Sequence, residues 1–244
     1  MNLKLFFIFI FLSTFLWNPS WSQTYRQKLQ TADSLFTAQK YTHALTLYQD
    51  ILENSDQFSL QMLLKMAFIK EGLGDHTSSL YYLNLYYNYH PNKKVLKKME
   101  ELAMKHKLNG YRYTDLEYFI SLYNQYYYYI IFFFLICALS YYLYLVIKNF
   151  RKKSLGLRPL LFITIMGIAF YLANFEIVPK KGIISKSGTY LMSAPSAASE
   201  PIAFTDKGHR VMILDKNDVW YKISWEDRQA YILESNLIVI GENK

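Results

Sequence analysis

The chain has 244 residues with a formal net charge of +8, and aromatic residues make up 18% of it. Its single cysteine, Cys137, excludes an internal disulfide framework and a metal site built from several cysteines of this chain. Three long apolar runs take up about a quarter of the sequence, so the rest is enough for two small soluble modules but not for one large core.

Residues 1–22 have the pattern of a secretory signal peptide. Lys4 precedes an apolar run at 5–17, and small residues at alternate positions follow, up to Ser22. A basic start, a short apolar stretch and small residues before the cleavage site are typical of such a signal. We expect cleavage after Ser22, with Gln23 onward outside the cytoplasm. An uncleaved signal anchor is the alternative interpretation, and it leaves the same residues on the same side.

Two further apolar runs predict a transmembrane hairpin. The run 126–147 carries no charge and is long enough to cross a bilayer as a helix, and the run 159–175 is shorter but almost wholly apolar. The loop 148–158 between them holds five basic residues and no acidic one, and short basic loops favour the cytoplasmic side. The sequence therefore predicts a multi-pass protein of the bacterial cytoplasmic (inner) membrane, with both soluble domains extracytoplasmic or periplasmic. A buried hairpin in a soluble protein is the alternative, which the length and purity of the runs disfavour.

Residues 23–109 are predicted to form a helical-repeat domain, because apolar residues recur at a period of about 3.6 and the pattern repeats. The offset between the repeats is 35 residues, and the matched positions are Ala32, Tyr41, Ala44, Leu45, Tyr48 and Ile51 in the first, with Ala67, Ser79, Leu80 and Leu83 in the second. Small residues at 32, 44, 67 and 79 let paired helices approach closely. Gly72, Gly74 and Asp75 predict the turn between the helices of the second repeat.

Over residues 25–92 this pattern resembles the tetratricopeptide-repeat family, although Ser79 and Lys70 replace the alanine and the apolar residue that are usual there. The resemblance implies stacked helix pairs whose concave face binds a peptide or a protein. From the repeat phase, the candidate partner-binding residues are Gln39, Lys65, Phe68 and Ile69. Ordinary helix surface or inter-repeat core is the alternative interpretation of these positions.

Pro91 ends the second repeat, since proline cannot continue a helix. A helix from Lys93 to about residue 108 is expected to cap the stack, and a membrane-proximal helix is expected at 110–125. The basic face of the cap helix is either solvated, which we favour, or in contact with anionic lipid or an acidic partner. Much of the positive charge lies next to membrane runs, so it indicates the lipid bilayer, and no nucleic acid, as a partner.

After a predicted linker at 176–182, residues 183–244 are expected to form a small all-β barrel. Apolar and polar residues alternate over short segments that turns separate. The predicted strands are 189–192, 209–214, 219–224, 230–233 and 237–240.

This region resembles bacterial SH3-type domains. The resemblance is carried by Leu191-Met192, Ala194-Pro195-Ser196, Lys207-Gly208, Trp220-Tyr221-Lys222-Ile223, and Ala230-Tyr231-Ile232 with Asn236-Leu237. Ala230-Tyr231 stands where the family usually has glycine and tryptophan, which weakens a carry-over of cell-wall binding. Trp220 is expected in the core. Tyr190, Trp225 and Tyr231 are expected to be exposed and are the candidate partner-binding residues of the barrel.

No catalytic, cofactor or metal-binding pattern is found in the sequence. The five histidines are scattered, and no pair has the spacing of metal ligands. Phosphate-binding loops, nucleophile elbows and metalloprotease helix motifs are missing from the sequence. We therefore expect no catalytic residues, no cofactor and no bound metal, and hence a protein that is not an enzyme.

The whole order predicts a multidomain membrane protein with all-α tetratricopeptide-like repeats, a two-helix transmembrane hairpin and a small all-β SH3-like barrel. This order resembles the membrane proteins encoded with the Bat aerotolerance systems of Bacteroidetes-type bacteria. The resemblance implies assembly with membrane or periplasmic proteins, including von Willebrand A-type domain proteins, in an aerotolerance or envelope-stress complex. A scaffold for a protein partner is the leading hypothesis. An envelope sensor that binds peptidoglycan or wall peptides, and a targeting subunit of a wall-modifying enzyme, are the alternatives.

Overall fold

The computed structural model describes residues 21–55, 58–112, 114–150, 158–174 and 180–241. The chain divides after Asp75 into two compact units, called here the N-terminal unit and the C-terminal unit. This division falls inside residues 23–109, which the sequence predicts as one helical domain. The bounds of that domain stay a prediction. The predicted signal peptide lies outside the described residues except for its last two positions, where a helix has already begun at Trp21.

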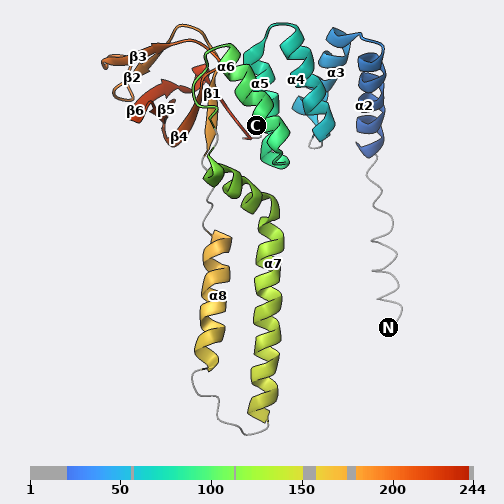
Figure 1. The fold of residues 1–244 in the computed structure, drawn as a ribbon, viewed down its shortest axis with the longest axis vertical. Coiled ribbons are helices and arrows are strands. Elements are labelled where there is room, and N and C mark those ends of the chain that lie inside the picture. The colour runs from blue at the N-terminus through green and yellow to red at the C-terminus, as the bar shows by residue number, and fades with distance from the viewer. Residues whose placement is uncertain (1–20, 56–57, 113, 151–157, 175–179, 242–244) are drawn as a thin grey trace, which may run out of the picture. The chain divides into compact units, whose positions relative to one another are not determined.

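In its described part, the N-terminal unit consists of three helices (Figure 1): α2 (Trp21–Thr37), α3 (Tyr41–Asn54) and α4 (Leu60–Gly72). Buried side chains recur every three or four positions, which is the spacing of one helix face. Ala32 and Ala44 are fully buried where α2 and α3 pack together, as the sequence predicts for small residues that allow a close approach.

Helices α2 and α4 end in the same way, 35 residues apart. The second residue beyond each helix is left-handed, with φ of 60° at Gln39 and 77° at Gly74. The N–H groups that follow fold back onto the last turn as a Schellman motif, which satisfies carbonyl groups that the helix end leaves open. The bonds run from Gln39 N to Phe36 O, Lys40 N to Leu35 O, Gly74 N to Glu71 O and Asp75 N to Lys70 O. Helical repeats are therefore present, while their assignment to the tetratricopeptide family stays a prediction.

The C-terminal unit begins with α5 (His76–Tyr89) and α6 (Lys93–Lys105). The side chain of Asn92 caps α6 by accepting a 2.8 Å hydrogen bond from the N–H of Lys94. The C-terminus of α6 is a third copy of the Schellman motif, with Lys107 at a φ of 55°. Helix α6 thus ends like the first helix of each repeat, but the described residues 106–112 that follow it are not helical.

Helix α7 (Asp115–Phe150) contains one segment, Glu117–Ile147, that is long and apolar enough to cross a membrane. It joins the predicted membrane-proximal helix and the first predicted span into one helix. The predicted start at residue 110 was wrong, because Gly110 has a φ of 89°, which is outside the helical region.

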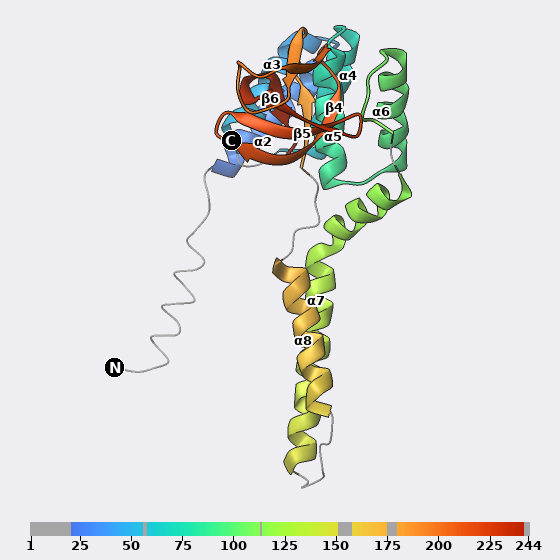
Figure 2. The same ribbon diagram turned by 90° about the vertical axis from the view of Figure 1, so that its left-hand side faces the viewer.

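Helix α8 (Arg158–Asn174) covers the second predicted span. It lies alongside α7 in both views (Figures 1 and 2), with the rings of Tyr142 and Phe162 6.0 Å apart. The basic loop predicted at 148–158 falls mostly outside the described residues. The two-helix transmembrane hairpin therefore stays a prediction, supported by one helix that meets the length and composition of a span.

The described residues after α8 form an antiparallel sheet in the order β3-β2-β6-β5-β4-β1-β7. The strands are β1 (Lys181–Ile184), β2 (Thr189–Met192), β3 (Pro201–Thr205), β4 (Arg210–Asn217), β5 (Trp220–Trp225), β6 (Arg228–Leu233) and β7 (Leu237–Val239). Five of them were predicted, whereas β1 and β3 were missed. The predicted linker 176–182 was wrong from Lys181 onward, because β1 begins there and pairs with both β4 and β7.

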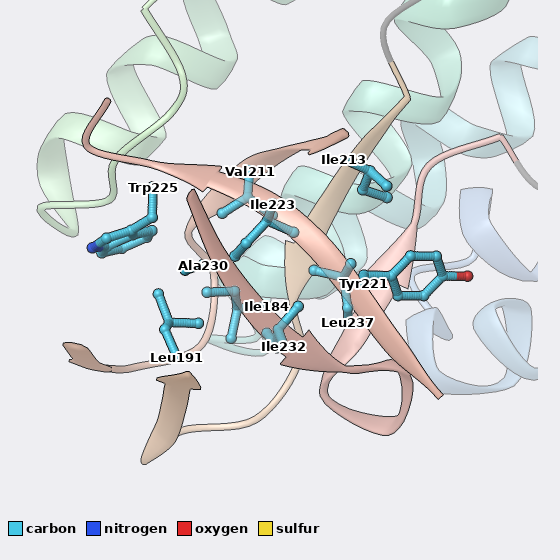
Figure 3. Close-up of a cluster of buried hydrophobic side chains, with 10 residues drawn as sticks. All are labelled: Ile184, Leu191, Val211, Ile213, Tyr221, Ile223, Trp225, Ala230, Ile232 and Leu237. Atoms are coloured by element: carbon cyan, nitrogen blue, oxygen red, sulfur yellow. The ribbon is translucent and has the colours of Figure 1, made fainter. Parts of the chain in front are cut away.

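The inner face of this sheet holds one hydrophobic core (Figure 3). Its members are Ile184, Leu191, Val211, Ile213, Tyr221, Ile223, Trp225, Ala230, Ile232 and Leu237. On β5 the inward residues are 221, 223 and 225, at the two-residue period of a strand. Trp220 is buried, as predicted, but it lies outside this cluster because alternation puts it on the other face of β5.

Candidate functional site

Three aromatic rings gather on the N-terminal unit. Phe36 lies near the end of α2, Tyr41 begins α3, and Phe68 lies on α4. Their ring centroids are 5.3, 5.9 and 5.8 Å apart in edge-to-face arrangements. Phe68 is nevertheless 56% exposed. This cluster, called the aromatic triad below, therefore presents a large apolar ring to solvent and braces it with two others, which is how anchor residues of interfaces are placed.

A charged group borders the aromatic triad. The Nζ atom of Lys65 is 2.8 Å from Oδ1 of Asp33 and 5.5 Å from the ring centroid of Phe36. The same Asp33 oxygen accepts a 2.6 Å hydrogen bond from the Tyr48 hydroxyl. Burial, together with this bond, raises the pKa of Tyr48 well above its usual value. Lys65 is therefore held beside the aromatic surface with its charge balanced, and the surface suits a segment that is mainly apolar.

Two of the four residues predicted on the helices lie at this surface, namely Lys65 and Phe68. Gln39 was predicted on an inner helix face, but it occupies the left-handed position in the turn after α2. Ile69 is only 2% exposed, so its predicted place on a binding surface was also wrong. Phe36 and Tyr41 were missed because the repeat phase places residues on helix faces but does not locate helix ends. Partner binding by any of these residues stays a prediction.

A second exposed aromatic group lies on the sheet. Tyr190 on β2 faces Phe204 on β3, with ring centroids 5.0 Å apart, and the two are 59% and 63% exposed. Ile202, on the same strand at the register shift between β2 and β3, is 37% exposed. We call these three residues the edge patch, since β3 is an edge strand. Tyr190 was predicted to be exposed, and its two neighbours were missed together with β3.

The other two residues predicted on the barrel differ from expectation. Trp225 is only 9% exposed and belongs to the core (Figure 3), so its predicted exposure was wrong. Counting by twos from the buried Ile223 places it inward. Its ring meets that of His209 edge to face at 5.3 Å. Tyr231 is half-buried and lies opposite Met192 and Lys222 on the neighbouring strands.

The non-helical residues after α6 contact the sheet where β4 begins, and this contact is called the joint below. The backbone N–H of Arg210 donates to the carbonyl of Asn109 at 3.1 Å, and the N–H of Asn109 donates to Nδ1 of His209 at 3.0 Å. The hydroxyl of Tyr111, which is 2% exposed, donates to the carbonyl of Gly208 at 2.8 Å. The segment is therefore fixed by both backbone and side-chain bonds.

Arg210 is the centre of the joint and is only 5% exposed. Its Nε donates to the carbonyl of Gly110 at 2.7 Å, and its Nη1 donates to Oδ1 of Asn84, a buried residue of α5, at 3.0 Å. The guanidinium carbon also lies 5.0 Å over the Tyr111 ring. A buried cation requires such partners, because its desolvation is costly. The side chain thus ties α5, the segment after α6 and β4 together.

Two glycines allow the segment after α6 and the start of β4 to approach each other closely. Gly110 and Gly208 have φ values of 89° and 100°, which favour glycine. A Cβ at Gly110 would overlap the carbonyl oxygen of Arg210. At Gly208 it would lie 3.1 Å from a methyl of Leu108 and 3.3 Å from the hydroxyl of Thr77.

Histidine 209 takes part in the joint as a hydrogen-bond acceptor. Because Nδ1 accepts from Asn109, it carries no proton in this arrangement. Burial lowers the pKa of His209, and the charges of Asp206 and Glu226 oppose this shift in part. Acid is therefore expected to weaken this bond.

Two contacts connect the sheet and α5 with the start of α7. Nζ of Lys181 on β1 is 3.3 Å from Oε1 of Glu117, and the hydroxyls of Tyr87 and Ser121 are 2.7 Å apart. Burial lowers the pKa of Lys181, the charge of Arg210 lowers it further, and Glu117 opposes both effects. The start of α7 is therefore held to the same assembly as the joint.

Residues 187–238 match the family model of the bacterial SH3 domain. These residues form a bacterial SH3 domain. The match runs from just before β2 into β7, so it includes Arg210, His209 and the edge patch, while β1 and the α-helices α2 to α8 lie outside it. No curated protein matches the chain significantly.

Within the part of the chain that the structure describes, three or more His, Cys, Asp or Glu side chains do not come together as a possible metal site. The surfaces built above offer binding geometry instead. They are the aromatic triad on the N-terminal unit, and the edge patch on an SH3 domain that the joint fixes to α5.

Proposed function

We propose that this protein is a membrane-anchored, non-enzymatic adaptor, which binds a protein partner on the extracytoplasmic side through its helical repeats and its SH3 domain. The observation that carries the proposal is the aromatic triad. The exposed Phe68 ring packs against two other rings and lies beside Lys65, which is paired with Asp33. It is an anchor for an apolar segment of a partner.

The joint supports the proposed topology. Gly110 precedes α7 and Arg210 follows α8, and a direct hydrogen bond joins them. If α7 crosses the membrane, both flanks must then be on the same side, so the segment between them has to return, which the predicted hairpin of α7 and α8 would allow. The basic loop and the signal pattern of the sequence favour the extracytoplasmic side for both flanks.

The order of the segments also guides the choice of partner. Its resemblance to Bat-type membrane proteins favours membrane or periplasmic proteins of the same system, including those with von Willebrand A-type domains. Participation in an aerotolerance or envelope-stress complex is part of this proposal.

The test is crosslinking of the full chain in native membranes, followed by identification of the crosslinked proteins. The variant Phe68→Ala is expected to lower recovery of the partner about tenfold or more, which is the size of a hot-spot effect. Glu53→Ala, at an exposed position of α3, is the matched control and should leave recovery unchanged. Equal recovery from the wild type, Phe68→Ala and the double variant Lys65→Gln/Phe68→Ala would contradict the proposal.

A second candidate function is the binding of peptidoglycan or wall peptides, which bacterial SH3 domains often bind. The edge patch favours it, because Tyr190 and Phe204 offer two exposed rings that a sugar or a peptide can cover. Co-sedimentation of the detergent-solubilised full chain with isolated cell wall tests it. Loss of binding in Tyr190→Ala/Phe204→Ala, with binding kept in Phe68→Ala, would support the sensor function. No sedimentation of the wild type would exclude it.

A further inference from the structure

The first half of α6 carries concentrated positive charge. Lys93, Lys94, Lys97 and Lys98 occupy four of its first six positions, and all four are exposed. The second half of the helix contains Glu100, Glu101 and Lys105 instead. We call the four lysines the lysine cluster.

The lysine cluster contributes little to the stability of α6. The N-terminus of a helix carries a partial positive charge, so lysines in the first turns are unfavourable, and the first turn of α6 has no acidic residue. The pair of Lys97 and Glu101 is 3.8 Å long and exposed on both sides, and such pairs contribute little. The Asn92 cap satisfies the helix end without any of the lysine side chains. A negative group outside the helix would add a favourable interaction for these charges.

Lys93, the first residue of the lysine cluster, lies beside the start of the apolar segment of α7. Its Nζ is 5.0 Å from the ring centroid of Tyr118. The apolar segment Glu117–Ile147 has 31 residues, more than the roughly 20 that cross the apolar core of a bilayer. Helix α7 bends near its start, so its first turns run oblique to the rest of the helix (Figures 1 and 2). If the straight part crosses the apolar core, Tyr118, and with it Lys93, lies in the headgroup layer.

The packing of α6 leaves the lysines off its buried face. The buried face of the helix consists of Val95, Leu96, Met99, Leu102 and Ala103. The lysines lie between and opposite these positions. Lys93 then lies within a Debye length of the lipid phosphates, and the other three lysines follow it within the first two turns of the same helix.

We infer that the lysine cluster binds the anionic phospholipid headgroups of the membrane that α7 enters. The inference rests on the proposed function in one respect, namely that α7 spans a membrane. Anionic headgroups attract each nearby lysine, and the attraction is screened by salt. The contact would fix α6, and through it the joint, against the membrane surface.

The first experiment measures lysine acetylation in the full chain by mass spectrometry, in nanodiscs of phosphatidylcholine and in nanodiscs with added phosphatidylglycerol. Acetylation of the lysine cluster is expected to slow by about fivefold in the anionic discs. Lys186 and Lys207, exposed on the SH3 domain, are the internal references and should react equally in both. The difference should disappear at about 1 M salt.

The second experiment compares two variants with the same loss of charge. Lys93→Gln/Lys94→Gln/Lys97→Gln/Lys98→Gln removes the lysine cluster, and Lys105→Gln/Lys107→Gln/Lys186→Gln/Lys207→Gln is the matched control, since all eight side chains are exposed. The anionic share of the lipid that co-purifies with each protein in polymer-bounded membrane discs should fall for the first variant only. Thermal unfolding identifies a variant that has lost its fold.

Alkaline carbonate extraction tests the membrane anchor separately from the lipid contact of the lysine cluster. A chain released by carbonate contradicts the membrane anchor and thus the proposed function. A chain that stays in the membrane, with lysine reactivity and co-purified lipid independent of the cluster, overturns this inference alone. Protection of the lysines only in the presence of an acidic protein would also overturn it, in favour of a protein ligand.

Discussion

The Nε atom of Arg210 and the carbonyl oxygen of Gly110 are 2.7 Å apart and are joined by a hydrogen bond, although 100 residues separate them in the chain. Those residues include both α7 and α8. The SH3 domain therefore returns to the segment that precedes α7, and a ligand on the domain acts on a body that is already attached to the start of that helix.

Replacing Arg210 by methionine is expected to loosen the joint. The Gly110 carbonyl and the buried Asn84 side chain would each lose the bond that Arg210 donates, so the free energy of unfolding of the C-terminal unit should fall by roughly 2–5 kcal/mol. Hydrogen exchange of residues 108–111 in the full chain should rise at the same time. Arg228→Met, at an exposed position, removes the same charge and should change neither quantity. Similar small effects from both variants would show that the joint contributes little.

Gly110→Ala is expected to lower stability by at least roughly 2 kcal/mol, because a side chain is strained at its φ of 89° and would overlap the backbone of Arg210. Gly72→Ala is the control. A Cβ at Gly72 meets nothing within 4 Å, so this change should be neutral or stabilise by up to about 1 kcal/mol. Thermal unfolding in nanodiscs compares them, and equal midpoints would contradict the geometry of the joint.

Acid is expected to weaken the joint through His209. Its pKa is lowered in the folded chain, so the unfolded chain binds its proton first as the pH falls. The stabilisation is complete above the unfolded pKa of about 6.5 and is lost as the pH falls through the folded value. His209→Asn keeps an acceptor near the Nδ1 position and should remove this component of the pH dependence. The control His43→Asn, exposed on α3, should retain it. Unfolding midpoints measured between pH 5 and 8, the range in which histidine titrates, decide between these outcomes.

Gln39→Gly is expected to stabilise the N-terminal unit by about 1 kcal/mol, because Gln39 holds the left-handed position that Gly74 holds 35 residues later. Gln27→Gly, in the middle of α2, should destabilise by about the same amount. Hydrogen exchange of α2 and α3 in the full chain measures both. A decrease in stability for Gln39→Gly would mean that the glutamine side chain contributes more than its backbone strain costs.

Local periodicity was sufficient to predict much of the fold. Strands β4 and β5 were predicted because apolar and polar residues alternate along half-buried strands. Strand β3 was missed because it starts with Pro201, which disfavours a strand except at an edge, and β3 is at the edge of the sheet. Strand β1 was missed because the lysines and glycine at its start have the composition of a linker. Only its pairing with β4 and β7 makes it a strand.

The candidate sites were less predictable. Lys65 and Phe68 were found because the repeat phase places them on one face of a helix. A one-residue error in phase reverses exposure, which explains the wrong placement of Ile69 and Trp225. The joint could not be predicted, since Arg210 finds its partners 100 and 126 residues away and no local pattern marks Asn84 or Gly110 as those partners.

The most direct test of the adaptor function places a photo-crosslinking amino acid at position 68 of the full chain in living cells. Position 53, exposed on α3, is the control. The adaptor function predicts a crosslink from position 68 to one defined membrane or periplasmic protein, and none to that protein from position 53. Irradiation that yields no protein crosslink from position 68, while cell-wall fragments are retained through Tyr190 and Phe204, would contradict the adaptor function and favour the wall sensor.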